Sequence, residues 1–285
     1  MSAILIDGKK ISENIFESLK LQISSFTETH NCKPGLAVVL VGEDKASRIY
    51  VKKKRKACLH LGIKSFKYNL EDTVSENELL ALINELNNKP TVNGILVQLP
   101  LPSHINEKRI IEAIKVEKDV DGFTEENSGK LFLGHDSMIP CTPKGILRLL
   151  KEYKIEIKGK NAVVLGRSNI VGKPTGMLLM KEHATITYCH SQTRDLDRHL
   201  KEADIIIAAI GKAEFVKKEH IKKEACIIDV GINRTEDGRL VGDVCFEDAS
   251  LICSYLTPVP GGVGPMTIAM LMENTLEAAK IQINK

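Results

Sequence analysis

The sequence predicts an α/β protein with two domains. Short apolar runs bounded by glycine alternate with amphipathic helical patterns along the chain, and this alternation is typical of mostly parallel sheets covered by helices. The length of 285 residues exceeds what a single hydrophobic core usually serves. The apolar share of 43% and the charged share of 27% are those of an ordinary globular protein.

The first 139 residues carry the predicted elements of one domain. Apolar residues recur at helical spacing over 9–30, which predicts a long opening helix. The run 35–42 is apolar and glycine-bounded, as expected of a buried strand. A basic helix follows and ends at Gly62, a residue suited to a helix C-terminus. The further predicted elements are a strand at 63–70, a helix that Ser75 and Glu78 begin as a capping box, a strand at 92–97 and a helix at 106–114.

The basic helix after strand 35–42 places one lysine on its apolar face. At about 100° per residue, Tyr50 and Cys58 share a face with Lys54, whereas the four neighbouring cations point elsewhere. Burial disfavours the charged form of a lysine, so its pKa falls and it can exchange a proton near neutral pH. The alternative is that Lys54 extends past its apolar neighbours to solvent.

Two further polar residues are candidates for the same site. Gln98 directly follows strand 92–97, and Asp121 lies in the later loop 118–123. Ligands of open α/β sheets bind at the carboxyl ends of the strands. We therefore expect Lys54, Gln98 and Asp121 in one site. Each of the latter two also has an ordinary interpretation, Gln98 as a turn residue and Asp121 as the start of an Asp-Gly turn.

A second unit is predicted from about residue 140, after the loop 140–145. Its strand at 160–165 runs directly into the glycine-bounded turn 166–174. Such a turn before a helix can bind a phosphate through backbone N–H groups and the helix dipole. The spacing is not GxGxxG, so a plain tight turn is the alternative. The further predicted elements are a helix from 173–174, strands at 184–188, 204–209 and 226–230, and a helix at 195–202.

The residues after strand 184–188 indicate which dinucleotide would bind. Folds selective for NAD usually place Asp or Glu there for the ribose hydroxyls. This strand is followed instead by Cys-His-Ser-Gln-Thr at 189–193, which contains no carboxylate. Arg167 in the turn 166–174 and Ser191 could both bind a 2′-phosphate. NADP is therefore the predicted cofactor.

The last part of the chain contains three glycine-containing segments, at 231–233, 242–244 and 256–267. The third contains Pro260, Gly261 and Gly262, and its proline and glycine content predicts a stiff loop that allows close approach, as suits the rim of a ligand site. A helix predicted over 265–283 is long enough to leave the second unit and pack on the first.

Composition limits the possible partners and compartment. A net charge of +3, with lysines spread through the chain, does not favour a nucleic-acid partner. Seven cysteines form no CxxC pair and no zinc-ligand spacing, so we expect reduced thiols in a cytosol and no metal. Neither a signal peptide nor a run of membrane-spanning length is present, so a soluble cytoplasmic protein is expected.

Six motifs occur in an order that resembles one family. They are Tyr50-x-x-x-Lys54, Gly94-Ile-Leu-Val-Gln-Leu-Pro-Leu-Pro102, Lys118-Asp-Val-Asp-Gly-Phe123, Pro140-Cys-Thr-Pro-Lys-Gly145, Gly166-Arg-Ser-Asn-Ile-Val-Gly-Lys-Pro174 and Thr257-Pro-Val-Pro-Gly-Gly-Val-Gly-Pro-Met-Thr267. The chain is similar, nearly end to end, to the bifunctional methylenetetrahydrofolate dehydrogenase/methenyltetrahydrofolate cyclohydrolases. It departs from the family's usual residues at Thr124, at Glu125–Glu126 and at Thr175–Gly176.

The resemblance implies a fold, two reactions and an assembly. An N-terminal α/β catalytic, folate-binding domain of residues 1–139, completed by 268–285, would accompany a Rossmann-like NADP-binding domain of residues 140–267, with a cleft between them. The implied reactions are NADP-dependent oxidation of 5,10-methylenetetrahydrofolate and hydrolysis of the methenyl product to 10-formyltetrahydrofolate. A homodimer is implied as well.

The resemblance also implies roles for particular residues. Asp121 would accept N–H groups of the reduced pterin, and Lys54 would move a proton in the hydrolysis. Tyr50 would stack on the folate, and Gln98 would hold Lys54 or the substrate. The implied folate-binding residues are Tyr50, Gln98, Asp121, Pro260, Gly261 and Gly262. The implied NADP-binding residues are Gly166, Arg167, Ser168, Ser191, Thr193 and Ile232.

Two other classes of protein would share much of this pattern. An NADP-dependent dehydrogenase of another small metabolite, such as a shikimate-type enzyme, would have the same two-domain plan. It would not require the segment 98–102 or the pair Tyr50 and Lys54. A non-catalytic nucleotide-binding protein would be expected to lack Lys54 or Asp121.

Overall fold

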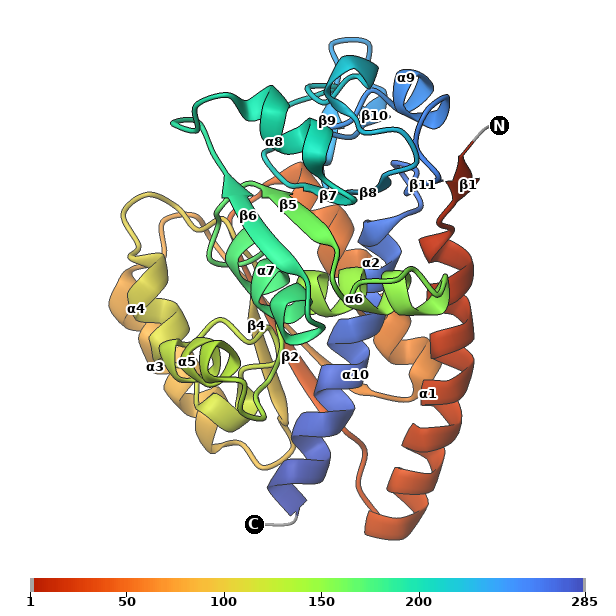
Figure 1. Ribbon diagram of the computed structural model, residues 1–285. Helices are drawn as coiled ribbons and strands as arrows, with labels where there is room; N and C mark the ends of the chain where they lie inside the picture. Colours follow the sequence, from red (N-terminus) through yellow and green to blue (C-terminus); the bar gives the residue numbers. More distant parts are fainter. Residues whose placement is uncertain (1–2, 284–285) are drawn as a thin grey trace. The chain divides into compact units, whose positions relative to one another are not determined.

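A computed structural model describes residues 3–283 as two compact α/β units. Unit 1 contains the chain up to Glu13 and Thr142–Thr267, and unit 2 contains Asn14–Cys141 and the chain from Ile268. The helices α1 (Gly8–His30) and α10 (Val263–Ile283) each begin in unit 1 and end in unit 2 (Figure 1). The predicted fold class, two α/β domains with parallel sheets, is confirmed.

Unit 2 contains a parallel three-stranded sheet in the order β3-β2-β4. All seven residues of its central strand β2 (Gly35–Val41) are buried, as the apolar run predicts. The flanking strands are β3 (Lys64–Leu70) and β4 (Gly94–Val97). The helices of this unit, besides the longer parts of α1 and α10, are α2 (Lys45–Leu61), α3 (Glu76–Asn88), α4 (Glu107–Glu112), the 3-10 turn Val116–Lys118 and α5 (Glu125–Leu133).

Local signals in the sequence fix the ends of α2 and α3. Asp44 caps the start of α2, since its carboxylate accepts the backbone N–H of Ser47 at 2.7 Å. Gly62 ends α2 in the left-handed conformation, with φ of 79°. Ser75 and Glu78 form the predicted capping box at the start of α3. The helix that carries Lys54 is therefore set by its own sequence.

Unit 1 contains a parallel six-stranded sheet in the order β1-β11-β8-β7-β5-β6. Its strands are β1 (Ile4–Leu5), β5 (Asn161–Leu165), β6 (Thr185–Cys189), β7 (Ile205–Ala208), β8 (Cys226–Asp229) and β11 (Tyr255–Leu256). A two-stranded hairpin, β9 (Asn233–Arg234) and β10 (Leu240–Val241), follows β8. The helices are α6 (Cys141–Glu152), α7 (Gly172–Lys181), α8 (Leu196–Glu202), the 3-10 turn Lys218–His220 and α9 (Phe246–Ser250). Helix α7 packs on β5 and β6 (Figure 1).

Three expectations from the sequence need correction. Residues up to Glu13 belong to unit 1 and not to the first domain, because β1 pairs with β11 through Ile4 and Tyr255. The segment 140–145 is not a loop: α6 begins at Cys141. The segment 256–267 begins inside strand β11 and ends inside α10, so only its middle is loop. Strands β1 and β11 are only two residues long, and prolines lie beside and within the first turn of α6. Such short or interrupted patterns give no periodicity from which these elements could be predicted.

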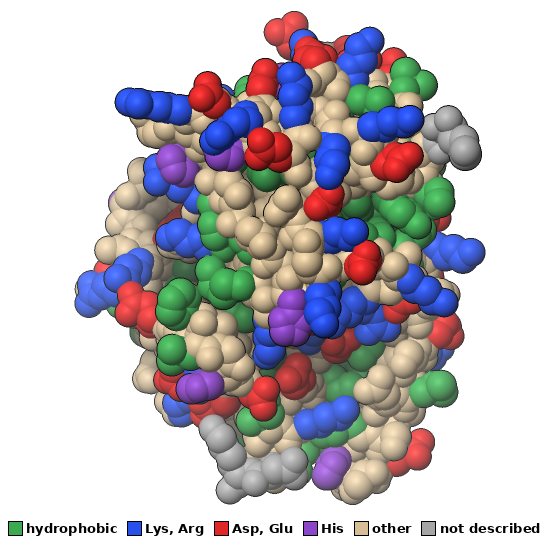
Figure 2. Space-filling view, in the orientation of Figure 1, with side chains coloured by type: hydrophobic (Ala, Val, Ile, Leu, Met, Phe, Trp, Pro, Cys, Tyr) green, Lys and Arg blue, Asp and Glu red, His purple; other side chains and the backbone are tan. Residues whose placement is uncertain are grey.

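Charged side chains of both signs are distributed over the visible surface (Figure 2). Figure 2 shows Lys and Arg side chains interspersed with Asp and Glu over the visible face, as the small net charge of +3 would suggest. Within residues 3–283, no helix has both the length and the apolar character needed to cross a membrane.

Candidate functional site

Helix α2 buries one of its five consecutive cationic side chains. Lys54 is only 8% exposed and lies with Val51, Ala57 and Cys58 on the buried face, whereas the neighbouring cations at 52, 53, 55 and 56 are exposed. The predicted partition of the basic residues is confirmed, and the alternative that Lys54 extends to solvent is wrong. A buried ammonium group requires a polar partner.

Gln98 is that partner. The Lys54 Nζ atom donates a hydrogen bond to Gln98 Oε1 at 3.0 Å. Gln98 directly follows β4, and its backbone N–H continues the pairing with β2 by donating to the Val39 carbonyl. Its side-chain Nε2 donates to the Leu99 carbonyl at 2.8 Å. Because Nε2 is held in this way, Oε1 faces the lysine.

Asp121 lies beside the same lysine. Burial raises the pKa of the Asp121 carboxyl from 3.8 to about 6, and the positive charge of Lys54 opposes this rise. The Asp119 carboxylate raises the pKa further, whereas a hydrogen bond from Cys141 lowers it. Burial lowers the pKa of Lys54, and the charges of Asp121 and of the Cys141 and Cys58 thiols partly restore it. Both shifts bring the two groups closer to exchanging protons near neutrality.

The loop that carries Asp121 is held by α10 and by the start of α6. Asn274 of α10 is fully buried, and its Nδ2 donates to the carbonyls of Val120 and Ile139, both at 2.9 Å. The Cys141 thiol lies 3.4 Å from the Val120 carbonyl and 3.6 Å from Asp121 Oδ1. Neither Asn274 nor Cys141 was assigned a role from the sequence. Asn274 shares a helix face with Met270, Leu271 and Ala278, and an asparagine on such an apolar face is the signal that could have identified it.

Thr124, one departure from the family pattern, has a defined structural role. Asp119 is buried and accepts the Thr124 backbone N–H at 2.9 Å and the Thr124 hydroxyl at 2.8 Å. It also accepts Asn127 Nδ2 at 2.9 Å. Thr124 in turn caps α5 by accepting the Asn127 backbone N–H. The threonine thus satisfies a buried carboxylate two residues from Asp121.

Tyr50 precedes Lys54 by one turn of α2 and is partly buried. Burial raises the pKa of its hydroxyl, which keeps the group protonated and able to donate a hydrogen bond. The Lys53 ammonium lies 5.9 Å from the centre of the Tyr50 ring.

The glycine-bounded turn 166–174 after β5 is closely packed in unit 1. Gly166 has φ of 120°, and a Cβ there would overlap the Ala209 carbonyl, while a Cβ on Gly172 would overlap the Gly166 carbonyl. Glycine is required at both positions. Ser168 Oγ accepts the backbone N–H groups of Val171 and Gly172, each at 3.2 Å, at the start of α7.

The other predicted cofactor residues also lie in unit 1. Arg167 and Ser191 are exposed, and no carboxylate occurs between the end of β6 and Arg194. Thr193 Oγ1 accepts the His190 backbone N–H at 2.8 Å, which gives the segment after β6 a fixed turn. Ile232 follows β8 and is 50% exposed.

Gly176, another departure from the family pattern, accommodates a tyrosine. A Cβ at Gly176 would overlap the hydroxyl of Tyr188, which donates to the Lys173 carbonyl at 2.9 Å. The glycine and the tyrosine therefore form a matched pair between α7 and β6.

The segment Pro260, Gly261 and Gly262 packs against the first turn of α1 within unit 1. The Gly261 carbonyl accepts the Lys9 backbone N–H at 2.9 Å, and a Cβ on Gly8 would overlap the Gly262 carbonyl. The structure thus brings together Tyr50, Lys54, Gln98 and Asp121 in unit 2. It places Gly166, Arg167, Ser168, Ser191, Thr193, Ile232 and residues 260–262 in unit 1.

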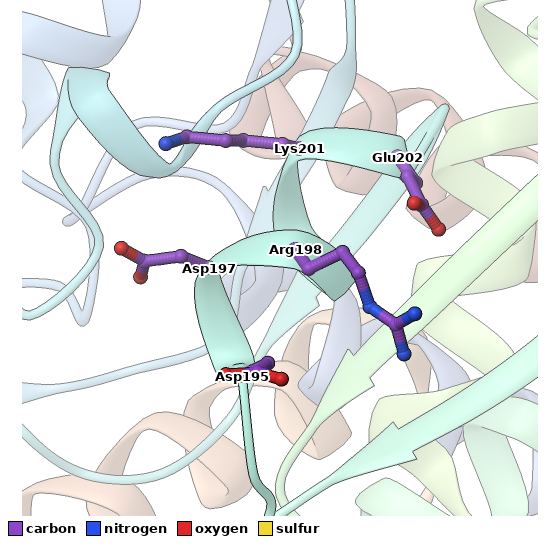
Figure 3. Close-up of a pocket in the computed structure, with 5 residues that line it drawn as sticks. All are labelled: Asp195, Asp197, Arg198, Lys201 and Glu202. Carbon is purple, nitrogen blue, oxygen red and sulfur yellow. The ribbon is translucent and has the colours of Figure 1, made fainter.

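A hollow on α8 is unrelated to this site. Figure 3 shows its lining side chains, which point apart and carry both signs of charge: Asp195, Asp197, Arg198, Lys201 and Glu202. None of them is a predicted site residue. Across residues 3–283, no cluster of His, Cys, Asp and Glu is arranged to hold a metal ion.

Comparison with known proteins identifies the family. Residues 6–121 match the family described as tetrahydrofolate dehydrogenase/cyclohydrolase, catalytic domain, and residues 140–283 match the NAD(P)-binding domain of the same description. The bifunctional protein FolD of Campylobacter hominis is 56% identical over 281 residues, which is 99% of each chain.

Solved structures agree with this assignment. The crystal structure of the bifunctional FolD methylenetetrahydrofolate dehydrogenase/cyclohydrolase from Campylobacter jejuni is 50% identical, with a TM-score of 0.96 over 99% of this chain and 100% of that one. The Trypanosoma brucei enzyme, solved with NADP cofactor and inhibitor, is 37% identical, also with a TM-score of 0.96, and covers 100% of both chains. Shikimate dehydrogenase from Aquifex aeolicus is 14% identical, with a TM-score of 0.54 over 88% of this chain and 98% of that one, and shares the fold alone. The chain therefore belongs to the tetrahydrofolate dehydrogenase/cyclohydrolase family and is a bifunctional methylenetetrahydrofolate dehydrogenase and methenyltetrahydrofolate cyclohydrolase.

Proposed function

We infer that Tyr50, Lys54, Gln98 and Asp121 form the folate site for both reactions, and that unit 1 binds NADP. One observation carries this proposal: a buried lysine is hydrogen-bonded to Gln98 and lies beside a carboxyl whose pKa burial raises to about 6. Perturbed acid–base groups brought together in this way are typical of active sites.

Asp121 holds the pterin in this proposal. A reduced pterin presents neighbouring N–H donors, and an ionised carboxylate can accept two of them. The hydrogen bonds of Asn274 to the flanking backbone keep Asp121 at a fixed position. Tyr50, with its hydroxyl protonated, stacks on the folate and donates a hydrogen bond to it.

Lys54 acts in the hydrolysis. Water adds to the methenyl carbon, and the neutral amine of Lys54 accepts the proton that the water loses. The bond from that carbon to one ring nitrogen then breaks, and the Lys54 ammonium can return a proton to that nitrogen. Of the two protons of the water, one remains on the nitrogen and one is released. The lowered pKa of Lys54 makes its neutral form accessible, and Gln98 keeps Nζ in place.

The dehydrogenase reaction needs positioning more than proton transfer. NADP, when bound, supplies the acceptor for the hydride that leaves the methylene carbon. The residues that would hold it are Gly166, Arg167, Ser168, Ser191, Thr193 and Ile232. The closely packed turn at Gly166 leads directly into the N-terminus of α7, whose helix dipole suits a phosphate. Arg167, together with the absence of a carboxylate after β6, supports NADP over NAD.

An assembly and a compartment complete the proposal. A homodimer is supported by the family resemblance, and light scattering on the purified protein measures it. A cytoplasmic location is supported by the seven cysteines, which form no CxxC pair and have no zinc-ligand spacing.

A two-part assay tests the proposed function. The purified protein should reduce NADP only when 5,10-methylenetetrahydrofolate is present, and should hydrolyse methenyltetrahydrofolate without any cofactor. Absence of both activities in folded protein would contradict the proposal.

A further inference from the structure

Two buried aspartates of unit 1 take no part in the reactions described above. Asp229 ends β8 and is 3% exposed, and Asp243 follows β10 and is 0% exposed. A buried carboxylate is costly unless hydrogen bonds satisfy it. Both residues belong to unit 1, whereas Lys54 belongs to unit 2.

Asp243 holds the segment that follows β7. Its Oδ2 accepts the backbone N–H groups of Ile210 at 2.6 Å and Gly211 at 3.0 Å, and its Oδ1 accepts that of Lys212 at 2.9 Å. Asn233 Nδ2 donates to Oδ1 as well, at 2.9 Å. One side chain therefore fixes three successive backbone groups of one loop and an amide of the next.

Asp229 holds Asp243 and the segment that follows β8. Its Oδ1 accepts the backbone N–H groups of Gly231 at 3.0 Å and Asp243 at 2.9 Å, and its Oδ2 accepts that of Val244 at 3.0 Å. The packing is reciprocal: a Cβ on Gly231 would overlap the Asp243 carboxylate, and a Cβ on Gly242 would overlap the Asp229 carboxylate. This explains the glycines of the segments 231–233 and 242–244.

The loops fixed in this way support the residues proposed for NADP. Ligands of parallel sheets bind beyond the carboxyl ends of the strands, and both loops leave such ends. The glycine-bounded turn 166–174 packs on the loop after β7, since Gly166 has no room for a Cβ beside the Ala209 carbonyl. Ile232 is 50% exposed although its neighbours Gly231 and Asn233 are both bound by the aspartates. The Ile232 side chain is therefore exposed to solvent from a backbone segment whose position the two aspartates fix.

We propose that Asp229 and Asp243 are positioning residues for the nicotinamide cofactor: they shape the loops after β7 and β8 that receive it, without contacting it. This inference rests on the proposed binding of NADP by unit 1. It differs from a purely structural role, which would alter thermal stability but leave the folded protein with its normal cofactor affinity.

The substitution Asp243→Asn tests the inference. The two oxygens of Asp243 each accept two hydrogen bonds, so either orientation of an asparagine turns an NH₂ group toward N–H donors. We expect the dissociation constant of NADP and its KM to rise about tenfold, since a hydrogen bond to a charged group is worth roughly that factor in an equilibrium constant. The value of kcat at saturating NADP should change less than KM. Hydrolysis of methenyltetrahydrofolate needs no cofactor, so its rate measures how much of each variant is folded and active.

Two further variants make the test decisive. Asp237→Asn is the matched control, because Asp237 is an exposed carboxylate in the neighbouring β9–β10 turn, paired with Arg239. It should bind NADP normally. Asn233→Ala removes one donor and keeps both carboxylates, and it should weaken NADP about threefold. If Asp243→Asn fails to fold, the result for Asn233→Ala decides.

The outcomes separate the inference from the function on which it rests. Folded variants that bind NADP as tightly as the unmutated enzyme, with only their melting temperatures lowered, would overturn the positioning role. If the unmutated enzyme itself bound no NADP, the proposed function would fail instead.

Discussion

Replacement of Lys54 by glutamine separates the two reactions. Lys54 is 8% exposed and donates a single 3.0 Å hydrogen bond to Gln98. A glutamine at this position has similar length, and its amide can also donate to Gln98 Oε1, but it neither accepts a proton nor carries charge. Because a buried neutral amide costs less to desolvate than an ammonium, we expect the variant to fold.

The expected loss falls on the hydrolysis. General acid–base help is worth about 10² to 10⁴ in rate, or about 3–5 kcal/mol of transition-state stabilisation, so cyclohydrolase activity should drop by that factor. Hydride transfer uses no protein base and should persist. The acid limb of the dehydrogenase pH profile should nevertheless move to higher pH. The Lys54 charge lowers the pKa of Asp121, so that pKa rises when the charge is removed.

The assay follows both products with one sample. The enzyme is supplied with methylenetetrahydrofolate and NADP. The absorbance of methenyltetrahydrofolate and that of the reduced cofactor are then recorded in the same sample, so that accumulation of the methenyl product can be compared with cofactor reduction. Lys56→Gln, an exposed position on the same helix, is the matched control and should behave as the unmutated enzyme. A parallel loss of both activities in folded Lys54→Gln would reduce the lysine to a positioning role. Unimpaired hydrolysis would remove it from the mechanism.

Four further predictions follow from the same geometry. Asp121→Ala should reduce both activities at least about a hundredfold while titration calorimetry still detects NADP binding, because the pterin loses its charged acceptor; near-normal activity in either assay would contradict this. Arg167→Ala should raise KM for NADP about tenfold or more and KM for NAD by much less, and an equal effect on both cofactors would exclude its contact with a 2′-phosphate. In the unmutated enzyme, kcat/KM for the folate should fall below about pH 6, since Asp121 is protonated below its raised pKa and ionised above it. A pH profile that stays flat between about pH 5 and about pH 7 would contradict the role of the Asp121 carboxylate as pterin acceptor. Asn274→Leu should lower the free energy of unfolding by about 1–3 kcal/mol and raise KM for the folate, because two buried carbonyls lose their donor; denaturant titration and steady-state kinetics measure the two effects.

Much of the fold could be predicted from local sequence. The apolar run 35–41, the capping box at Ser75 and Glu78, and the glycine at 62 each act over a few residues, and each forms the element that it predicts. The face on which Lys54 lies follows from helical periodicity alone. These features depend on backbone conformation and hydrogen bonds within a turn or two, which are written in neighbouring residues.

Pairing between distant segments could not be predicted in that way. Residues up to Glu13 join unit 1 because Ile4 and Leu5 pair with residues 255 and 256, some 250 positions later, and a two-residue strand has no period to detect. Likewise α6 begins at Cys141, within the segment 140–145, which is predicted from the sequence to be a loop.

The sequence by itself determined that Lys54, Gln98 and Asp121 are the candidates for chemistry: Lys54 interrupts an apolar helix face, Gln98 directly follows a strand, and Asp121 lies in a later loop that can reach the same site. Only the tertiary structure decided what holds them. Asn274 reaches the carbonyls of Val120 and Ile139 from a helix more than a hundred residues away, and Asp243 gathers backbone groups of a loop some thirty residues earlier. The physical reason is that a buried polar group must find its partner wherever the fold provides one, and the position of that partner is a property of the packed chain.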